Sequence, residues 1–179
     1  MTQGEQQALF EVGPNEEIGY RGPVACQVAG ITYRQLDYWA RTKLVVPSIR
    51  AARGHGTQRL YSFKDILVIK IVKGLLDAGI SLQNIRVAVE KLRDLGMGDL
   101  ATVTLVSDGR SVYACHNANE VFDLLSGAQG VFGIAVPGLV RELNGVISDF
   151  DGYEVSKLRP VDELAEMRAK RDARKKKTS

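Results

Sequence analysis

The sequence predicts an α+β fold in which an N-terminal winged helix-turn-helix unit precedes a small C-terminal α+β unit. Two observations predict the first unit: short helical stretches on either side of Gly30, and a glycine-containing, β-prone segment that follows them. A third observation predicts the second unit, because the helical period of the apolar residues gives way to strand-like segments after Gly96. The chain is therefore divided into a disordered tail at 1–19, the winged unit at 20–96, a small α+β dimerisation or effector unit at 97–152, and a charged basic tail at 153–179.

The helix-turn-helix is justified residue by residue. Pro23 suits the first turn of a helix over 23–29, because its missing N–H is not needed there. Gly30 supplies a tight turn, and Thr32 can cap a second helix over 32–42. Within that helix Leu36 and Trp39 lie three residues apart and are expected to face inward. The polar and tyrosine side chains are expected on the outer face, although Tyr38 fits a core position equally well.

Residues 44–61 predict a hairpin with a loose tip, since two β-prone ends flank a stretch with two glycines. Ser62 and Asp65 have the spacing of a capping box, and they predict a well-buried helix over 63–78. Gly79 ends this helix. Ser81 is expected to cap another helix over 82–95 that keeps a clean apolar stripe.

The C-terminal unit shows a different pattern. Asp108-Gly109 is a strong hairpin signal between β-prone segments at 101–107 and 110–116. A short helix at 119–126, a strand near 131–136 and a helix after Pro137 complete the predicted α+β unit.

Charge is distributed unevenly along the chain. Residues 20–95 contain 13 Lys and Arg against five acids, a net charge of +8, whereas residues 1–19 carry −4 and residues 96–156 carry −6. Residues 157–179 carry +5 and include four consecutive basic residues at 174–177. A basic block the size of one small domain is the electrostatic footprint expected where a nucleic-acid backbone docks, although many basic faces are only solvated.

Several classes of function are disfavoured. No apolar run is long enough to span a bilayer, and the acidic, polar N-terminus is unlike a secretory signal. Cys26 and Cys115 cannot form a disulfide framework, so we expect a cytoplasmic protein with no membrane partner. His55 and His116 are isolated, which predicts no metal site, no cofactor and no catalytic residues.

The segment from Ala29 to Ile66 resembles the DNA-binding domain of the MerR family of transcription regulators. The resemblance is carried by the ordered set Ala29-Gly30-Ile31-Thr32, Tyr38-Trp39, Leu44 with Pro47, Arg59-Leu60-Tyr61-Ser62-Phe63-Lys64-Asp65-Ile66, and Ala78-Gly79-Ile80-Ser81-Leu82. It covers residues 20–95. It implies double-stranded promoter DNA as the partner, a homodimer on an inverted repeat, distortion of that DNA, and a further contact with RNA polymerase.

Docking of the second helix in the major groove would bring particular side chains to DNA. Arg34 is the best candidate for guanine, because its fork matches O6 and N7. The wing would bring basic side chains to phosphates or the minor groove. Each of these residues could instead be an ordinary surface or core residue. Tyr20 and Tyr61 are secondary candidates for hydrogen bonds to phosphates. The full predicted set is Tyr20, Thr32, Tyr33, Arg34, Tyr38, Arg41, Arg50, Arg53, His55, Arg59 and Tyr61.

The sequence departs from the family after Leu95. Gly96, Gly98 and the hairpin stand where relatives continue into a long dimerisation helix, so we expect a dimer built by residues 97–150. This arrangement resembles the actinobacterial branch associated with cell-division genes. Two other hypotheses are a sensor whose C-terminal unit binds a metabolite or protein, and an architectural or recombination accessory factor, against which the chain length argues.

Overall fold

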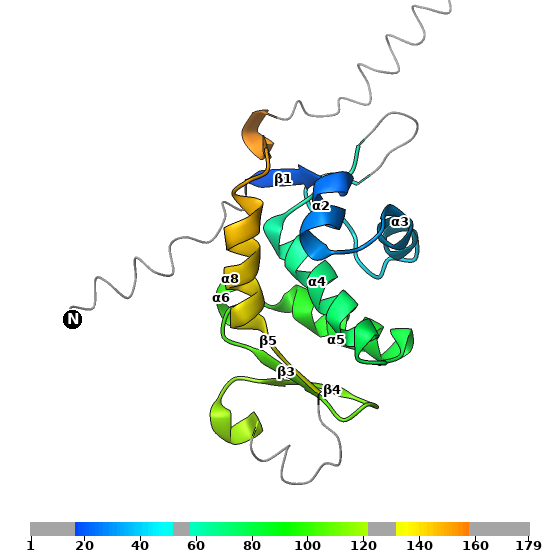
Figure 1. Ribbon diagram of the computed structural model, residues 1–179, viewed down its shortest axis with the longest axis vertical. Helices are drawn as coiled ribbons and strands as arrows, with labels where there is room; N and C mark the ends of the chain where they lie inside the picture. The colour runs from blue at the N-terminus through cyan, green and yellow to red at the C-terminus, as the bar shows by residue number, and fades with distance from the viewer. Residues whose placement is uncertain (1–16, 52–57, 122–131, 158–179) are drawn as a thin grey trace, which may run out of the picture.

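A computed structural model describes residues 17–51, 58–121 and 132–157 (Figure 1). Its N-terminal part contains β1 (Ile18–Arg21), α2 (Gly22–Ala29), α3 (Tyr33–Arg41), β2 (Leu60–Tyr61), α4 (Phe63–Asp77) and α5 (Leu82–Asp94). The C-terminal part contains α6 (Met97–Leu100), β3 (Thr104–Ser107), β4 (Val112–Cys115), β5 (Phe132–Ala135), α8 (Val136–Ile147), β6 (Tyr153–Glu154) and a 3-10 turn at Val155–Lys157. This mixture of helices and two small sheets is the α+β class that the sequence predicts.

The helix boundaries follow the predicted caps. Gly30 ends α2 with a φ of 73°, in the left-handed region that glycine adopts without a Cβ clash. The Ser62 hydroxyl accepts the Asp65 N–H at 3.1 Å, and an Asp65 carboxylate oxygen accepts the Ser62 N–H at 2.9 Å. This reciprocal pair starts α4 as a capping box, and Ser81 caps α5 in the simpler one-bond form.

The C-terminal sheet has the order β4-β3-β5, and all its pairings are antiparallel. The hairpin at Asp108-Gly109 is confirmed, with Gly109 at a φ of 88° and Asp108 accepting the N–H groups of Arg110 and Ser111. Strand β5 leads directly into α8, in which Pro137 occupies the first turn. The helix predicted at 119–126 lies mostly outside the described residues.

The two units share one hydrophobic core. Buried residues of α2, α4 and α5 form a single cluster with Leu100, Leu105, Ile134, Leu143 and Ile147 of the C-terminal half. In Figure 1, α8 runs beside α4 and connects the C-terminal sheet to the winged unit. The boundary predicted near residue 96 is therefore a change of secondary structure within one packed body.

Two of the predicted tail boundaries are wrong. Strand β1 begins at Ile18, inside the predicted N-terminal tail, and β6 lies inside the predicted C-terminal tail. The two strands pair, so that the N-terminal sheet has the order β2-β1-β6. Gly152 permits this closure, because a Cβ there would collide with Ile18, and the Arg21 guanidinium stacks 4.6 Å from the centre of the Tyr153 ring.

Candidate DNA-binding interface

The second helix of the helix-turn-helix, α3, begins at a capping box. The Thr32 hydroxyl accepts the Gln35 N–H at 3.2 Å, while the Gln35 side-chain oxygen accepts the Thr32 N–H at 3.0 Å. The same hydroxyl donates to that Gln35 oxygen at 3.2 Å. Thr32 thus fixes where α3 starts, and a contact between its hydroxyl and DNA would compete with these bonds.

Helix α3 has one buried face and one exposed face. Leu36 and Trp39 are 1% and 3% exposed, as their spacing predicts, and they anchor the helix to the core. Tyr33 and Tyr38 are 60% and 46% exposed, which resolves Tyr38 as a surface residue. Arg34 is also exposed and has no ion-pair partner among the residues that the structure describes. The outer face is therefore a set of aromatic and basic groups available to a partner.

Asp37 connects this face to the wing. One of its carboxylate oxygens accepts Arg59 Nη1 at 2.8 Å, and the other accepts Arg41 Nε at 2.8 Å. The hydrogen bond from Arg59 is the main reason why the pKa of Asp37 is lowered, and the same bond raises the pKa of Arg59. Arg59 and Arg41, both predicted DNA contacts, are thus held by the two oxygens of one carboxylate.

The base of the wing is anchored at two points. Arg50 and Leu60 form an antiparallel bridge, with N–H to carbonyl distances of 3.1 and 2.9 Å. Ser48 donates both its N–H and its hydroxyl to Asp65 at 2.7 Å, so Asp65 fastens the wing as well as capping α4. The predicted contacts Arg53 and His55 lie outside the described residues.

Tyr20 and Tyr61 do not belong to this surface. They are register partners in the β1–β2 pair, and they are 4% and 0% exposed. Among the described residues, the Tyr61 hydroxyl is a fully buried side-chain group with no hydrogen-bond partner, and burial raises the pKa of Tyr61 to about 12. The predicted phosphate contacts of both tyrosines are therefore corrected, since side chains buried in the core cannot reach a duplex.

Sequence reasoning missed the residues that fix the end of α3. Arg93 of α5 donates to the carbonyls of Lys43 and Leu44 at 2.9 and 2.7 Å, and Arg86 donates to the carbonyl of Thr42 at 2.8 Å. Lys43 has a φ of 58°, a left-handed conformation that costs a non-glycine residue about 1 kcal/mol. Cations at the C-terminal end of a helix also interact favourably with its dipole. The seven-residue spacing of the two arginines on one helix face was the available signal.

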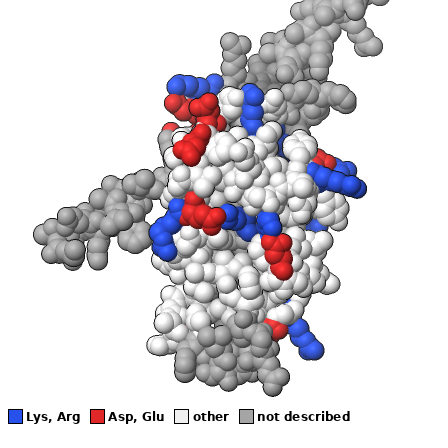
Figure 2. All heavy atoms as spheres, in the orientation of Figure 1, with Lys and Arg blue, Asp and Glu red and all other residues white. Residues whose placement is uncertain are grey.

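The surface carries charge in keeping with this arrangement. Figure 2 shows Lys and Arg side chains over α3 at the right-hand edge of the molecule, while acidic and basic groups alternate across the middle of the same face. Two further exposed basic residues are Lys43, after the end of α3, and Arg21, at the end of β1. Both lie beside the predicted set.

The family model described as MerR HTH family regulatory protein matches residues 20–92. Uncharacterized HTH-type transcriptional regulators of Mycobacterium tuberculosis and Mycobacterium bovis are 68% identical to this chain over 163 residues, which cover 89% of this chain and 72% of each relative. This chain belongs to the MerR family. It is accordingly a helix-turn-helix, DNA-binding transcriptional regulator.

Within this MerR protein the described residues after α5 do not form a long helix. Helix α5 ends at Asp94, and the four-residue α6 and the β3–β4 hairpin follow. Cys26 is buried in the core, with its pKa raised by burial, and Cys115 is buried at the end of β4. None of the described helices is long and apolar enough to span a membrane.

Proposed function

We propose that this MerR regulator binds promoter DNA sequence-specifically as a homodimer, with α3 in the major groove and the wing against the adjacent backbone. The observation that carries the proposal is the exposed face of α3, with Tyr33, Arg34 and Tyr38, which Asp37 ties to Arg59 at the base of the wing. A helix held on its other face by Leu36 and Trp39 can enter a major groove without disturbing the core.

Roles within the interface follow from exposure and partners. Arg34, at the N-terminal end of α3 and without an ion-pair partner among the described residues, would read a guanine. Arg41 and Arg59, already oriented by Asp37, would bind phosphates, because each guanidinium pairs with Asp37 through one nitrogen and carries further N–H donors. Tyr33, whose ring lies close to Gly22, would pack against the sugar-phosphate chain next to the start of α2.

A dimer is part of the proposal because one α3 reads only a half-site of an inverted repeat. The β4-β3-β5 sheet supports a dimer built by the C-terminal unit, since its edge strand β4 exposes Tyr113. The resemblance of the sequence to the actinobacterial branch associated with cell-division genes makes such promoters the first targets to map, and RNA polymerase the partner to examine on them.

The test combines genome-wide mapping of bound sites with footprinting and quantitative binding on one site. We expect a palindromic site and a two-to-one protein-to-DNA stoichiometry. Arg34→Ala is expected to lower cognate affinity by about 1–3 kcal/mol and to remove discrimination at one base pair. Arg141→Ala, an exposed arginine on α8, is the matched control and should leave both quantities unchanged.

Two results would contradict the proposal. One is an unchanged ratio of cognate to scrambled binding for Arg34→Ala, which would refute the groove assignment. The other is a monomer by light scattering at micromolar concentration, free and on DNA, which would refute the dimer.

A further inference from the structure

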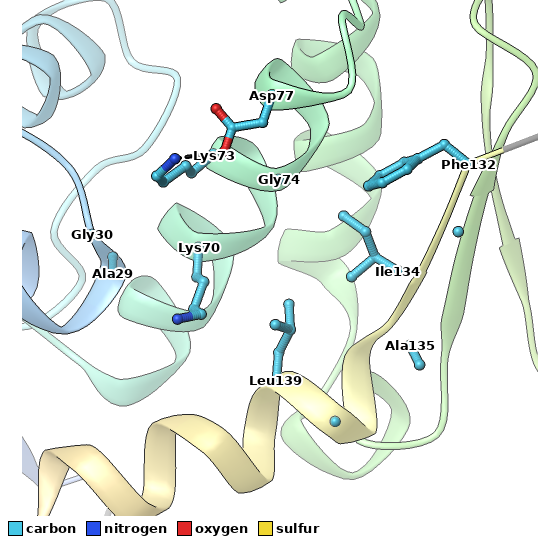
Figure 3. Close-up of a pocket in the computed structure, with 12 residues that line it drawn as sticks. Ala29, Gly30, Lys70, Lys73, Gly74, Asp77, Phe132, Ile134, Ala135 and Leu139 are labelled. Atoms are coloured by element: carbon cyan, nitrogen blue, oxygen red, sulfur yellow. Dashed lines mark hydrogen bonds and ion pairs between the residues drawn. The ribbon is translucent and has the colours of Figure 1, made fainter.

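An open pocket of about 550 Å³ lies between the winged unit and the C-terminal unit. As Figure 3 shows, one wall is formed by α4, and the opposite wall by β5 and the first turn of α8. The turn between α2 and α3, at Ala29-Gly30, closes a third side. Its volume is in the range of small-molecule sites. The pocket therefore lies at the boundary of the two units, where neither unit alone would form it.

One side of the pocket is apolar. The side chains of Phe132, Ile134 and Leu139 converge from β5 and α8, and Phe132 remains 38% exposed although it lies on a sheet that packs against the core. Gly138 in the first turn of α8 leaves space here, because a Cβ built on it meets no atom within 4 Å. This side offers an unfilled apolar surface to a ligand of limited size.

The other side carries two amines from α4. Lys70 Nζ forms an ion pair with Glu142 of α8 at 2.7 Å, and Lys73 Nζ forms one with Asp77 at 2.5 Å. In each pair the lysine is the more buried partner: Lys70 is 20% exposed against 55% for Glu142. Glu142 does not line the pocket, so an incoming anion can take its place on Lys70 while Glu142 turns into solvent.

The pocket also touches the helix-turn-helix directly. A Cβ at Gly30 would lie 3.7 Å from Lys73 Cε, so the stem of Lys73 packs on the turn that precedes α3. A ligand that moves Lys73 or fills the space beside Gly30 would therefore act on the turn that sets the position of α3.

We propose that this pocket binds a small amphipathic anion, with its apolar body against Phe132, Ile134 and Leu139 and its anionic head group on Lys70. Occupancy changes DNA affinity through the Ala29-Gly30 turn, and this regulatory step rests on the proposed function above. The binding step does not depend on it.

Binding is tested on the full chain with three probes of equal length: octanoate, octanol and octylammonium. Calorimetry should show saturable binding of octanoate, weaker binding of octanol and none of octylammonium. In a sample with labelled isoleucine methyl groups, octanoate should shift the Ile134 signal. Equal affinity for the three probes, or no saturable binding of octanoate, overturns the proposal.

Variants then locate the site. Gly138→Leu fills the pocket and should abolish octanoate binding, whereas Gly145→Leu, the same change on the same helix outside the pocket, should preserve it. Lys70→Met should weaken the binding of octanoate about fivefold and leave the binding of octanol unchanged, because it removes one partly exposed charge. Glu142→Gln should strengthen the binding of octanoate, since the carboxylate that competes for Lys70 is gone. If Gly138→Leu unfolds the chain, the Lys70 and Glu142 variants and the Ile134 signal still decide.

The regulatory step is measured as the change in affinity for the mapped promoter site with octanoate present. A shift of severalfold that Gly138→Leu removes and Gly145→Leu retains supports it. Octanoate binding without any change in DNA affinity refutes the regulatory step alone. A change of oligomeric state in Gly138→Leu, with no octanoate binding to the wild type, would assign the pocket to contact with a second copy and overturn the proposal.

Discussion

Replacing Tyr61 with phenylalanine separates the two roles that can be assigned to this residue. The sequence predicts a phosphate contact for Tyr61, whereas the structure buries the whole side chain between β1 and α4. Its hydroxyl is buried and has no hydrogen-bond partner in the part of the chain that the structure describes. Tyr61→Phe removes that single oxygen and leaves the packing of the ring intact, so it changes little else.

The expected effect on stability follows from the missing partner. A buried polar group without a hydrogen bond costs about 1–3 kcal/mol, so Tyr61→Phe should raise the free energy of unfolding by about 1 kcal/mol. For a protein of this size that corresponds to a rise in Tm of about 2–4 °C. The affinity for promoter DNA should not change, because the hydroxyl cannot reach the surface.

The same variant has a signature at high pH. The pKa of Tyr61 is raised from 10.0 to about 12 by burial, so the folded state holds the proton more tightly than the unfolded state. The free energy of unfolding of the wild type therefore keeps its neutral-pH value below pH 10 and falls as the pH rises toward 12, because the unfolded state loses this proton first. Two pKa units correspond to about 3 kcal/mol in total, so the wild type should lose stability relative to Tyr61→Phe above pH 10.

Urea unfolding at pH 7 and at pH 11, with promoter binding at pH 7, measures all three quantities. Tyr20→Phe on the partner strand is the matched control for a change from tyrosine to phenylalanine, since that hydroxyl is not among the unpartnered buried atoms. A loss of stability in Tyr61→Phe would show that the hydroxyl has a partner, and a loss of DNA affinity would return Tyr61 to the interface.

Two further predictions concern the supports of α3. Asp37→Asn should lower the ratio of cognate to scrambled binding severalfold, because Arg41 and Arg59 lose the anchor that orients them. It should also steepen the salt dependence of DNA affinity, because the carboxylate that partly neutralises these two arginines is gone. Asp149→Asn is the control, and an unchanged ratio would refute the anchor. Arg93→Met should destabilise the fold by about 1 kcal/mol and weaken promoter binding, because two carbonyls after α3 lose their donor. A thermal melt and a binding titration measure the two effects, and Lys91→Met on the same helix should change neither stability nor binding. Equal effects of the two variants would exclude the specific role of Arg93.

The elements of the winged unit could be predicted because their signals are local. Thr32, Ser62 and Ser81 precede helices whose first N–H groups need an acceptor, and Gly30 occupies a backbone conformation that other residues adopt at a cost. The Asp108-Gly109 hairpin is equally local. The pairing of β1 with β6 was missed because it joins residues far apart in the sequence. In addition, neither the two-residue strand Tyr153–Glu154 nor the residues beside it show the alternation of apolar and polar residues that indicates a strand.

The exposure of the candidate site residues was predicted only where it follows from helical periodicity. Arg34 and Tyr38 fall on the face of α3 opposite Leu36 and Trp39, so their exposure follows from the spacing. In a two-residue strand such as Leu60–Tyr61, both side chains are buried, and alternation gives no guide to which one faces a partner. The Tyr61 assignment failed for this reason, and the Tyr20 assignment failed because β1 buries Gly19 and Tyr20 in succession.

The position of α3 depends on polar contacts as much as on apolar packing. Asp37 ties its middle to the wing, and Arg93 ties the segment after it to α5. The C-terminal unit packs against α2, α4 and α5, and in Figure 1 α8 lies on the side of the molecule away from α3. A signal from the C-terminal unit can therefore reach α3 through α4, through α5, or through α2 and the Gly30 turn, and the pocket beside Lys73 lies on one of these routes. A change at the Gly30 turn moves the start of α3 while Arg93 holds its end, so the expected motion is a tilt of the helix in the groove, which would alter discrimination at the base pair under Arg34 more than contacts to phosphates.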